Sequence, residues 1–159
     1  MRARGARMHA EIIGFGCNSD GKHVTQPQAE TMQVALRLAL EDAGLDPAAI
    51  GFVSGHGAAT EWGDIAETNA TNAVFGAAMP IHSLKGFFGH SLGACGAIEA
   101  WLSIEMMREG WFCPTVNLVN VDERCRAAGL RYGCAAEARN RASDEQQFRL
   151  QWRQYIIDS

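Results

Sequence analysis

Three stretches of helical periodicity, each ended by a glycine, alternate along the chain with short apolar stretches that suit buried strands. Helices are predicted over residues 25–45, 64–76 and 91–110, ending at Gly44, Gly76 and Gly110. Strands are predicted over residues 9–16, 51–54 and 79–85, with late candidates over 114–118 and 130–133. This alternation predicts an α/β layer fold in which helices pack against a sheet.

Length and composition fit one soluble folded domain. The chain has 159 residues, of which 47% are hydrophobic and 20% charged. A net charge of -4 argues against nucleic acid or an anionic membrane surface as a partner. No apolar run has the length of a membrane span, and the N-terminus lacks the apolar core of a secretory signal. The expected location is therefore the cytoplasm.

The cysteines point to reduced thiols. There are five of them, an odd number, and no pair has the spacing C-x-x-C. Neither a disulfide framework nor a zinc site is predicted.

Three polar groups stand at the ends of predicted elements: His56 and Lys85 after strands, and His90 before a helix. Each alone is more often a structural or solvated residue, but together they form a specific pattern. Glycines flank both histidines, so a substrate can approach the imidazoles closely. A neutral imidazole can donate a hydrogen bond to a carbonyl oxygen and stabilise charge developing there. Lys85 could pair with a carboxylate, for which Glu67 is the candidate, so the set suits enolate or thioester chemistry.

The same stretches carry a family resemblance. "VSGHGAATEWGDIAE", then "SLKGFFGHSLGACGAIEAWLSI", then "PTVNL" resemble the C-terminal half of a β-ketoacyl-acyl carrier protein synthase, over about Gly5 to Gly133. The resemblance implies a thiolase-type fold, in which two similar α/β halves form an αβαβα core. The fold expected here is the C-terminal half of that thiolase-like fold, a mixed sheet packed with helices.

The resemblance also implies a reaction and roles. Members condense an acyl chain, held on a catalytic cysteine, with malonyl carrier protein in fatty acid or polyketide synthesis. His56 and His90 match the two family histidines, which hydrogen-bond the malonyl thioester carbonyl and stabilise the enolate. Lys85 matches the family lysine, and Glu67 the carboxylate expected to pair with it. No cofactor is implied, because the phosphopantetheine arm of the acyl carrier protein carries the substrate.

The sequence departs from the family at two points that concern the site. Ala58 stands where the family usually has threonine after the first His-Gly, which removes a hydroxyl contact to the pantetheine arm. The nucleophilic cysteine belongs to the family's N-terminal half, which nothing in this sequence matches. Cys17 falls in a predicted loop and Cys95 in the first turn of a helix, and neither is expected to replace it. Alone, the chain is expected to be inactive, because activity needs a partner that supplies the cysteine half. The expected protein partners are acyl carrier protein and either an N-terminal condensing half or a homodimer partner.

Domain 1–142 is assigned to the synthase-like domain and residues 143–159 to an atypical tail. The family would continue with a strand and a glycine-rich loop, whereas this chain has "SDEQQFRLQWRQYIIDS". If suitable codons are assumed for this segment, reading them in another frame gives Phe-Ala-Phe-Ser-Gly-Gly-Asn. This peptide is close to the family motif. We interpret the tail from about Ser143 as a frameshift product. It could also form an amphipathic helix, with Phe148, Trp152, Tyr155 and Ile156 on one face.

Three functional hypotheses remain open at this point: part of a condensing enzyme, a non-catalytic module for carrier-protein binding or dimerisation, and a gene relic. Thiolase-fold families that pair cysteine with histidine and asparagine would not need the Lys85–His90 spacing. A metal-dependent hydrolase is disfavoured, because His56, His82 and His90 lack recognised ligand spacings.

Overall fold

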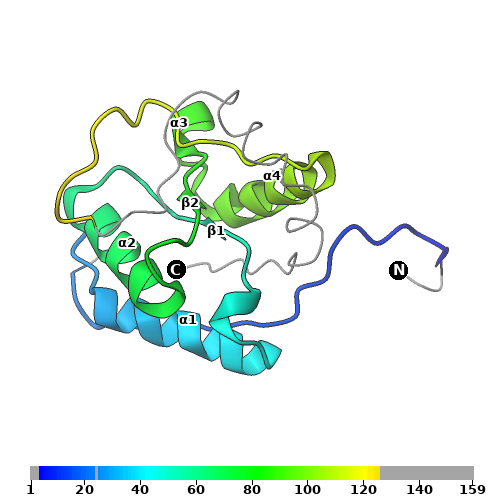
Figure 1. The fold of residues 1–159 in the computed structure, drawn as a ribbon, viewed down its shortest axis with the longest axis horizontal. Coiled ribbons are helices and arrows are strands. Elements are labelled where there is room, and N and C mark those ends of the chain that lie inside the picture. The colour runs from blue at the N-terminus through cyan, green and yellow to red at the C-terminus, as the bar shows by residue number, and fades with distance from the viewer. Residues whose placement is uncertain (1–3, 24, 126–159) are drawn as a thin grey trace.

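A computed structural model describes residues 4–23 and 25–125 (Figure 1). The candidate strand at 130–133, the tail 143–159 and Cys134 lie outside the described residues.

Four α-helices, two strands and two short 3₁₀ helices form the described fold. In chain order they are α1 (Ala29–Ala43), η2 (Pro47–Ala49), β1 (Val53–Ser54), α2 (Glu61–Phe75), β2 (Ile81–His82), α3 (Lys85–Phe88), η3 (Leu92–Ala94) and α4 (Cys95–Glu109).

The three predicted long helices are all present, as α1, α2 and α4. Gly44 and Gly110 end α1 and α4 with φ values of 64° and 68°, left-handed conformations that favour glycine. Helix α1 begins at Ala29, four residues later than the predicted stretch. Among the described helices, none combines the length and apolar character that a membrane span requires.

The predicted strands at 51–54 and 79–85 form a parallel pair. Val53 is in register with Ile81, and Ser54 with His82. Within residues 4–23 and 25–125 the sheet contains these two strands. The α/β class is thus confirmed. Residues 114–118 contribute a single bridge residue, Thr115, and no strand.

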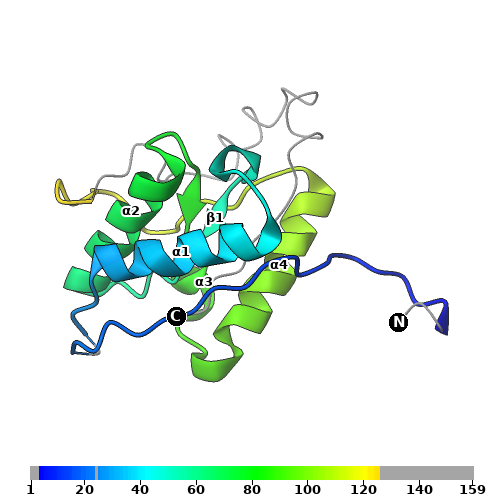
Figure 2. The same ribbon diagram turned by 90° about the horizontal axis from the view of Figure 1, so that it is seen from below.

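Residues 9–16 were predicted to be a strand, and this prediction is wrong for the described fold. The segment runs as extended chain alongside α1 (Figure 2). A Cβ on Gly16 would lie 2.2 Å from the carbonyl oxygen of Ala35, and one on Gly14 would lie 2.4 Å from that of Ala39. The N–H of Phe15 donates to Oδ2 of Asp42 on the helix, at 2.9 Å. The segment therefore lies against a helix face, and it forms no ladder with a strand among residues 4–23 and 25–125.

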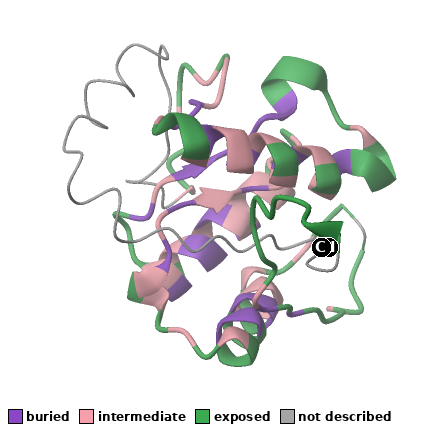
Figure 3. Cartoon of the chain, turned by 90° about the vertical axis from the view of Figure 1, so that its right-hand side faces the viewer, coloured by how far each residue is buried: buried purple, intermediate pink, exposed green. Residues whose placement is uncertain are grey.

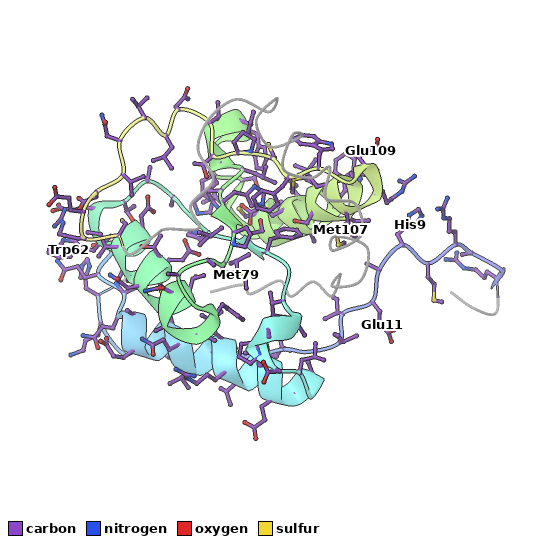
Figure 4. The ribbon with its side chains drawn as sticks, in the orientation of Figure 1. His9, Glu11, Trp62, Met79, Met107 and Glu109 are labelled. Atoms are coloured by element: carbon purple, nitrogen blue, oxygen red, sulfur yellow. The ribbon has the colours of Figure 1, made fainter. Side chains whose placement is uncertain are left out.

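Two apolar clusters lie on either side of the strand pair, and buried residues gather on the inward faces of the helices (Figure 3). One cluster joins α1 to α2 and contains Leu36, Leu40, Ile50, Ala70, Val74 and Met79. The other joins α4 to the chain on either side of it and contains Leu84, Met106 and Cys113. Met79 points into the interior, whereas Trp62 and Glu109 lie on opposite sides of the helical part of the molecule (Figure 4).

Candidate active site

The parallel strand pair brings the predicted site residues together. The N–H of Gly55, just after β1, donates to the carbonyl oxygen of His82 at the end of β2, at 2.8 Å. Both strands therefore end at the same edge, where ligand sites of α/β folds commonly form. His56 follows β1, and Lys85 opens α3 immediately after β2.

The two imidazoles are in contact. The ring centroids of His56 and His90 are 4.9 Å apart, and the rings meet edge to face at 80°. The N–H of Leu92 donates to Nδ1 of His90 at 3.0 Å, in a turn where Leu92 has a φ of 53°. A neutral His90 then carries its proton on Nε2, so that this nitrogen is a donor. His90 is exposed and His56 is half-buried, so a substrate from solvent can reach the pair.

Glu67 holds the His56 loop by its backbone. The N–H of His56 donates to Oε1 of Glu67 at 2.6 Å, and the N–H of Gly57 donates to Oε2 at 2.8 Å. Burial raises the pKa of Glu67, although these two hydrogen bonds oppose the rise. Gly55 leaves room for this carboxylate, since a Cβ there would lie 3.3 Å from Oε2.

The predicted pairing of Lys85 with Glu67 is wrong. Nζ of Lys85 lies 2.7 Å from Oε1 of Glu99 on α4, and the two side chains are 6% and 9% exposed. The carboxylate of Glu67 instead accepts two backbone N–H groups, those of His56 and Gly57. Burial opposes the charged form of Lys85, but contacts with Glu99 and Cys95 leave its pKa raised.

Cys95 completes this buried cluster. Its thiol donates to the same oxygen of Glu99, Oε1, at 3.2 Å. Cys95 is buried at the first position of α4, whereas Cys17 is exposed. The spacing of Cys95 and Glu99, four residues apart, puts both on one face of a helix and was the available signal for Glu99.

Sequence reasoning also missed two hydroxyl residues. Ser83 donates from Oγ to the carbonyl oxygen of Gly57 at 3.0 Å, and its own N–H donates to Oγ1 of Thr115 at 3.0 Å. Only the position of Ser83, two residues before Lys85, gave any hint of a role.

The assembled site offers two adjacent imidazoles and a buried ammonium–carboxylate pair. In its neutral form, His90 has its proton on Nε2. Such an arrangement can stabilise negative charge on a carbonyl oxygen.

The profile of the family described as β-ketoacyl synthase, C-terminal domain, matches residues 9–119. The chain belongs to this family. That match covers the strand pair, both histidines, Lys85 and Glu99, so the β-ketoacyl synthase domain contains the whole of the candidate site.

Known synthases are similar over most of the domain. A 3-oxoacyl-[acyl-carrier-protein] synthase 2 of Staphylococcus aureus is 36% identical over 129 residues, covering 78% of this chain and 32% of that protein. The crystal structure of a β-ketoacyl synthase from Burkholderia phymatum STM815 is 57% identical with a TM-score of 0.78, covering 82% of this chain and 32% of that one.

A second similar structure is a type II polyketide synthase acyl-carrier protein in complex with its ketosynthase, bound to the hexaketide. It is 33% identical with a TM-score of 0.73, covering 79% of this chain and 32% of that one. The chain thus spans about a third of the length of the relatives it matches, and its fold is part of the thiolase-like fold of the ketosynthases.

Proposed function

We propose that this chain supplies the decarboxylating, enolate-stabilising part of a β-ketoacyl-acyl carrier protein synthase. The observation that carries the proposal is the contact of His56 with His90, together with the hydrogen bond that Nδ1 of His90 accepts from the N–H of Leu92. That hydrogen bond leaves Nε2 of a neutral His90 ring as the donor. Two imidazoles this close can both donate to the carbonyl oxygen of one thioester. The similar synthases and the family match support the reaction class.

In the proposed reaction, a malonyl thioester loses its carboxylate as carbon dioxide. The electron pair of the broken C–C bond passes to the thioester carbonyl, and His56 and His90 stabilise the resulting enolate oxygen. The enolate carbon then attacks an acyl thioester held on a cysteine, forming the new C–C bond and expelling the cysteine thiolate. The buried Lys85–Glu99 ion pair contributes a fixed dipole to the electrostatics of the site.

The substrates and partners follow from the same proposal. Malonyl carrier protein presents the thioester on its phosphopantetheine arm, and the N-terminal half of the synthase provides the nucleophilic cysteine. A related ketosynthase has been solved with its acyl-carrier protein, which supports a carrier protein as partner. Leu92 and Trp101 are 77% and 60% exposed, and these apolar side chains suit contact with a second chain or half.

The test is a chimera in which residues 9–119 replace the matching segment of the Burkholderia phymatum synthase. We expect it to release carbon dioxide from malonyl carrier protein. Changing His56 or His90 to alanine should slow release about 10²- to 10³-fold. The control is H23A, because His23 is an exposed histidine whose side chain is hydrogen-bonded to that of Thr25. This variant should retain activity. Equal rates in all four proteins would overturn the proposal, as would condensation by the 159-residue chain alone that is abolished in H90A.

A further inference from the structure

We propose that Ser83 is a positioning residue that fixes the His56 loop against the first turn of α3, where Lys85 begins. The proposal rests on the proposed function for the purpose of that loop. Ser83 lies between β2 and α3 and is 7% exposed. It touches none of the atoms that would react, so its effect passes through the backbone of the loop.

The hydroxyl of Ser83 joins two chain segments. Its Oγ donates to the carbonyl oxygen of Gly57 at 3.0 Å, and the N–H of Lys85 donates to the same Oγ at 3.3 Å. One hydroxyl thus acts as donor to the loop after β1 and as acceptor from the helix after β2. A serine hydroxyl can fill both roles at once, whereas an alanine can fill neither.

Ser83 and Glu67 hold opposite polar groups of the same loop. Glu67 accepts the N–H groups of His56 and Gly57, while Ser83 binds the carbonyl of Gly57. Without Ser83, the Gly57 carbonyl would lose this partner on the β2 side, while Glu67 would still hold the two N–H groups from α2. The ring of His56 could then rotate away from His90, with which it is now in edge contact.

The fit between Ser83 and the loop is close. A Cβ on Gly57 would lie 2.4 Å from Cβ of Ser83, and Gly57 has a φ of 42°. Glycine therefore permits both the approach and the backbone conformation at this position. The contact leaves no space for the loop to move toward β2.

Ser83 is itself supported from a third segment. Its N–H donates to Oγ1 of Thr115 at 3.0 Å. The next residue, Val116, packs against α3, because a Cβ on Gly86 would lie 2.5 Å from Cγ1 of Val116. The chain after α4 therefore buttresses Ser83, and loss of the Thr115 hydroxyl should weaken the same arrangement.

The test is NMR of the full chain with labelled histidine. In the wild type we expect a nuclear Overhauser effect between the rings of His56 and His90. S83A should shift the His56 ring signals and reduce that effect at least twofold, whereas S83T, which keeps the hydroxyl, should restore both. S54A is the matched control, since Oγ of Ser54 has no hydrogen-bond partner in the described part of the chain. His9 and His23 serve as remote reference signals.

Unchanged His56 signals in S83A would overturn the proposal. If S83A does not fold, T115V decides instead, because valine keeps the shape of threonine and removes only the acceptor of the Ser83 N–H. Unchanged His56 signals in T115V would then reject the positioning role of Ser83.

The chimera separates this inference from the proposed function. In the chimera, S83A should lower the kcat of decarboxylation about 10- to 100-fold. An inactive wild-type chimera with an intact NMR effect would reject the function alone, and full activity in S83A would reject the positioning role.

Discussion

The imidazole of His82 is enclosed by aromatic rings. Its centroid lies 5.9 Å from that of Phe52 and 4.3 Å from that of Phe112, and the residue is 1% exposed. Burial lowers its pKa from 6.5 to about 4, and the backbone of Cys113 offsets only part of that shift. The folded protein therefore binds fewer protons here than the unfolded chain between these two pH values.

This difference predicts a loss of stability in mild acid. Stability rises with pH wherever the unfolded state binds more protons, so the contribution of His82 falls as pH drops from about 6.5 towards about 4. Between pH 7 and pH 5 we expect a loss of about 2 kcal/mol from this group. Urea unfolding of the wild type and of H82F, at pH 7 and at pH 5, measures this loss of unfolding free energy. The variant should lose about 2 kcal/mol less than the wild type, and identical pH dependence would contradict the prediction.

The buried pair of Lys85 and Glu99 gives a second prediction at this scale. E99A leaves a buried ammonium without its carboxylate and should cost about 3–5 kcal/mol of unfolding free energy. The control is E105A on the same helix, where the salt bridge to Arg108 has side chains 37% and 42% exposed and should contribute under about 1 kcal/mol. Denaturant unfolding of E99A and E105A measures the loss of unfolding free energy in each variant. The double variant K85M/E99L should recover much of the loss, and equal effects of E99A and E105A would refute the argument.

Among the elements, the extended segment before α1 depends on two glycines. G16A would place a Cβ 2.2 Å from the carbonyl oxygen of Ala35, so the segment must move off the helix. Amide hydrogen exchange of Phe15, whose N–H donates to Asp42, should become at least tenfold faster. G93A is the control, because a Cβ on Gly93 meets nothing within 4 Å. Unchanged exchange in G16A would show that the segment does not lie against α1 in solution.

The elements also show what local sequence signals can and cannot predict. Periodicity and a following glycine are local, and they located α1, α2 and α4 and the C-terminal end of each. Residues 9–16 have strand-like alternation, but joining a sheet requires a partner strand, and in the described fold a helix occupies that place. The segment is extended, as predicted, but it pairs with no strand in the part of the chain that the structure describes.

The same limit applies to the site. Sequence reasoning selected His56 and His90, and the fold brings the two rings together. The choice between Glu67 and Glu99 as partner of Lys85 depends on which faces α2 and α4 turn toward the strand ends. That orientation is set by tertiary packing. Ser83 carried no motif that sequence alone could interpret, because its role depends on the approach of Gly57.

For the whole molecule, the exposed apolar side chains predict self-association. Phe87, Leu92 and Trp101 lie on α3, η3 and α4 and are 55%, 77% and 60% exposed. Sedimentation velocity of the purified chain should show mass rising with concentration. W101E should shift the distribution toward monomer, whereas V119E, at a position 82% exposed in the chain after α4, should have less effect. Monomeric wild type at every concentration would contradict this expectation.

The anchoring of the His56 loop has a consequence for genetics. Glu67 recognises the N–H groups of residues 56 and 57, which every amino acid except proline possesses. Codons for most other residues at position 56 should therefore yield folded protein at normal abundance while removing the imidazole. In a deep mutational scan that reports abundance and activity separately, position 56 should tolerate replacement in the first measurement and not in the second. Position 67 should be intolerant in both, because its carboxylate holds the backbone itself.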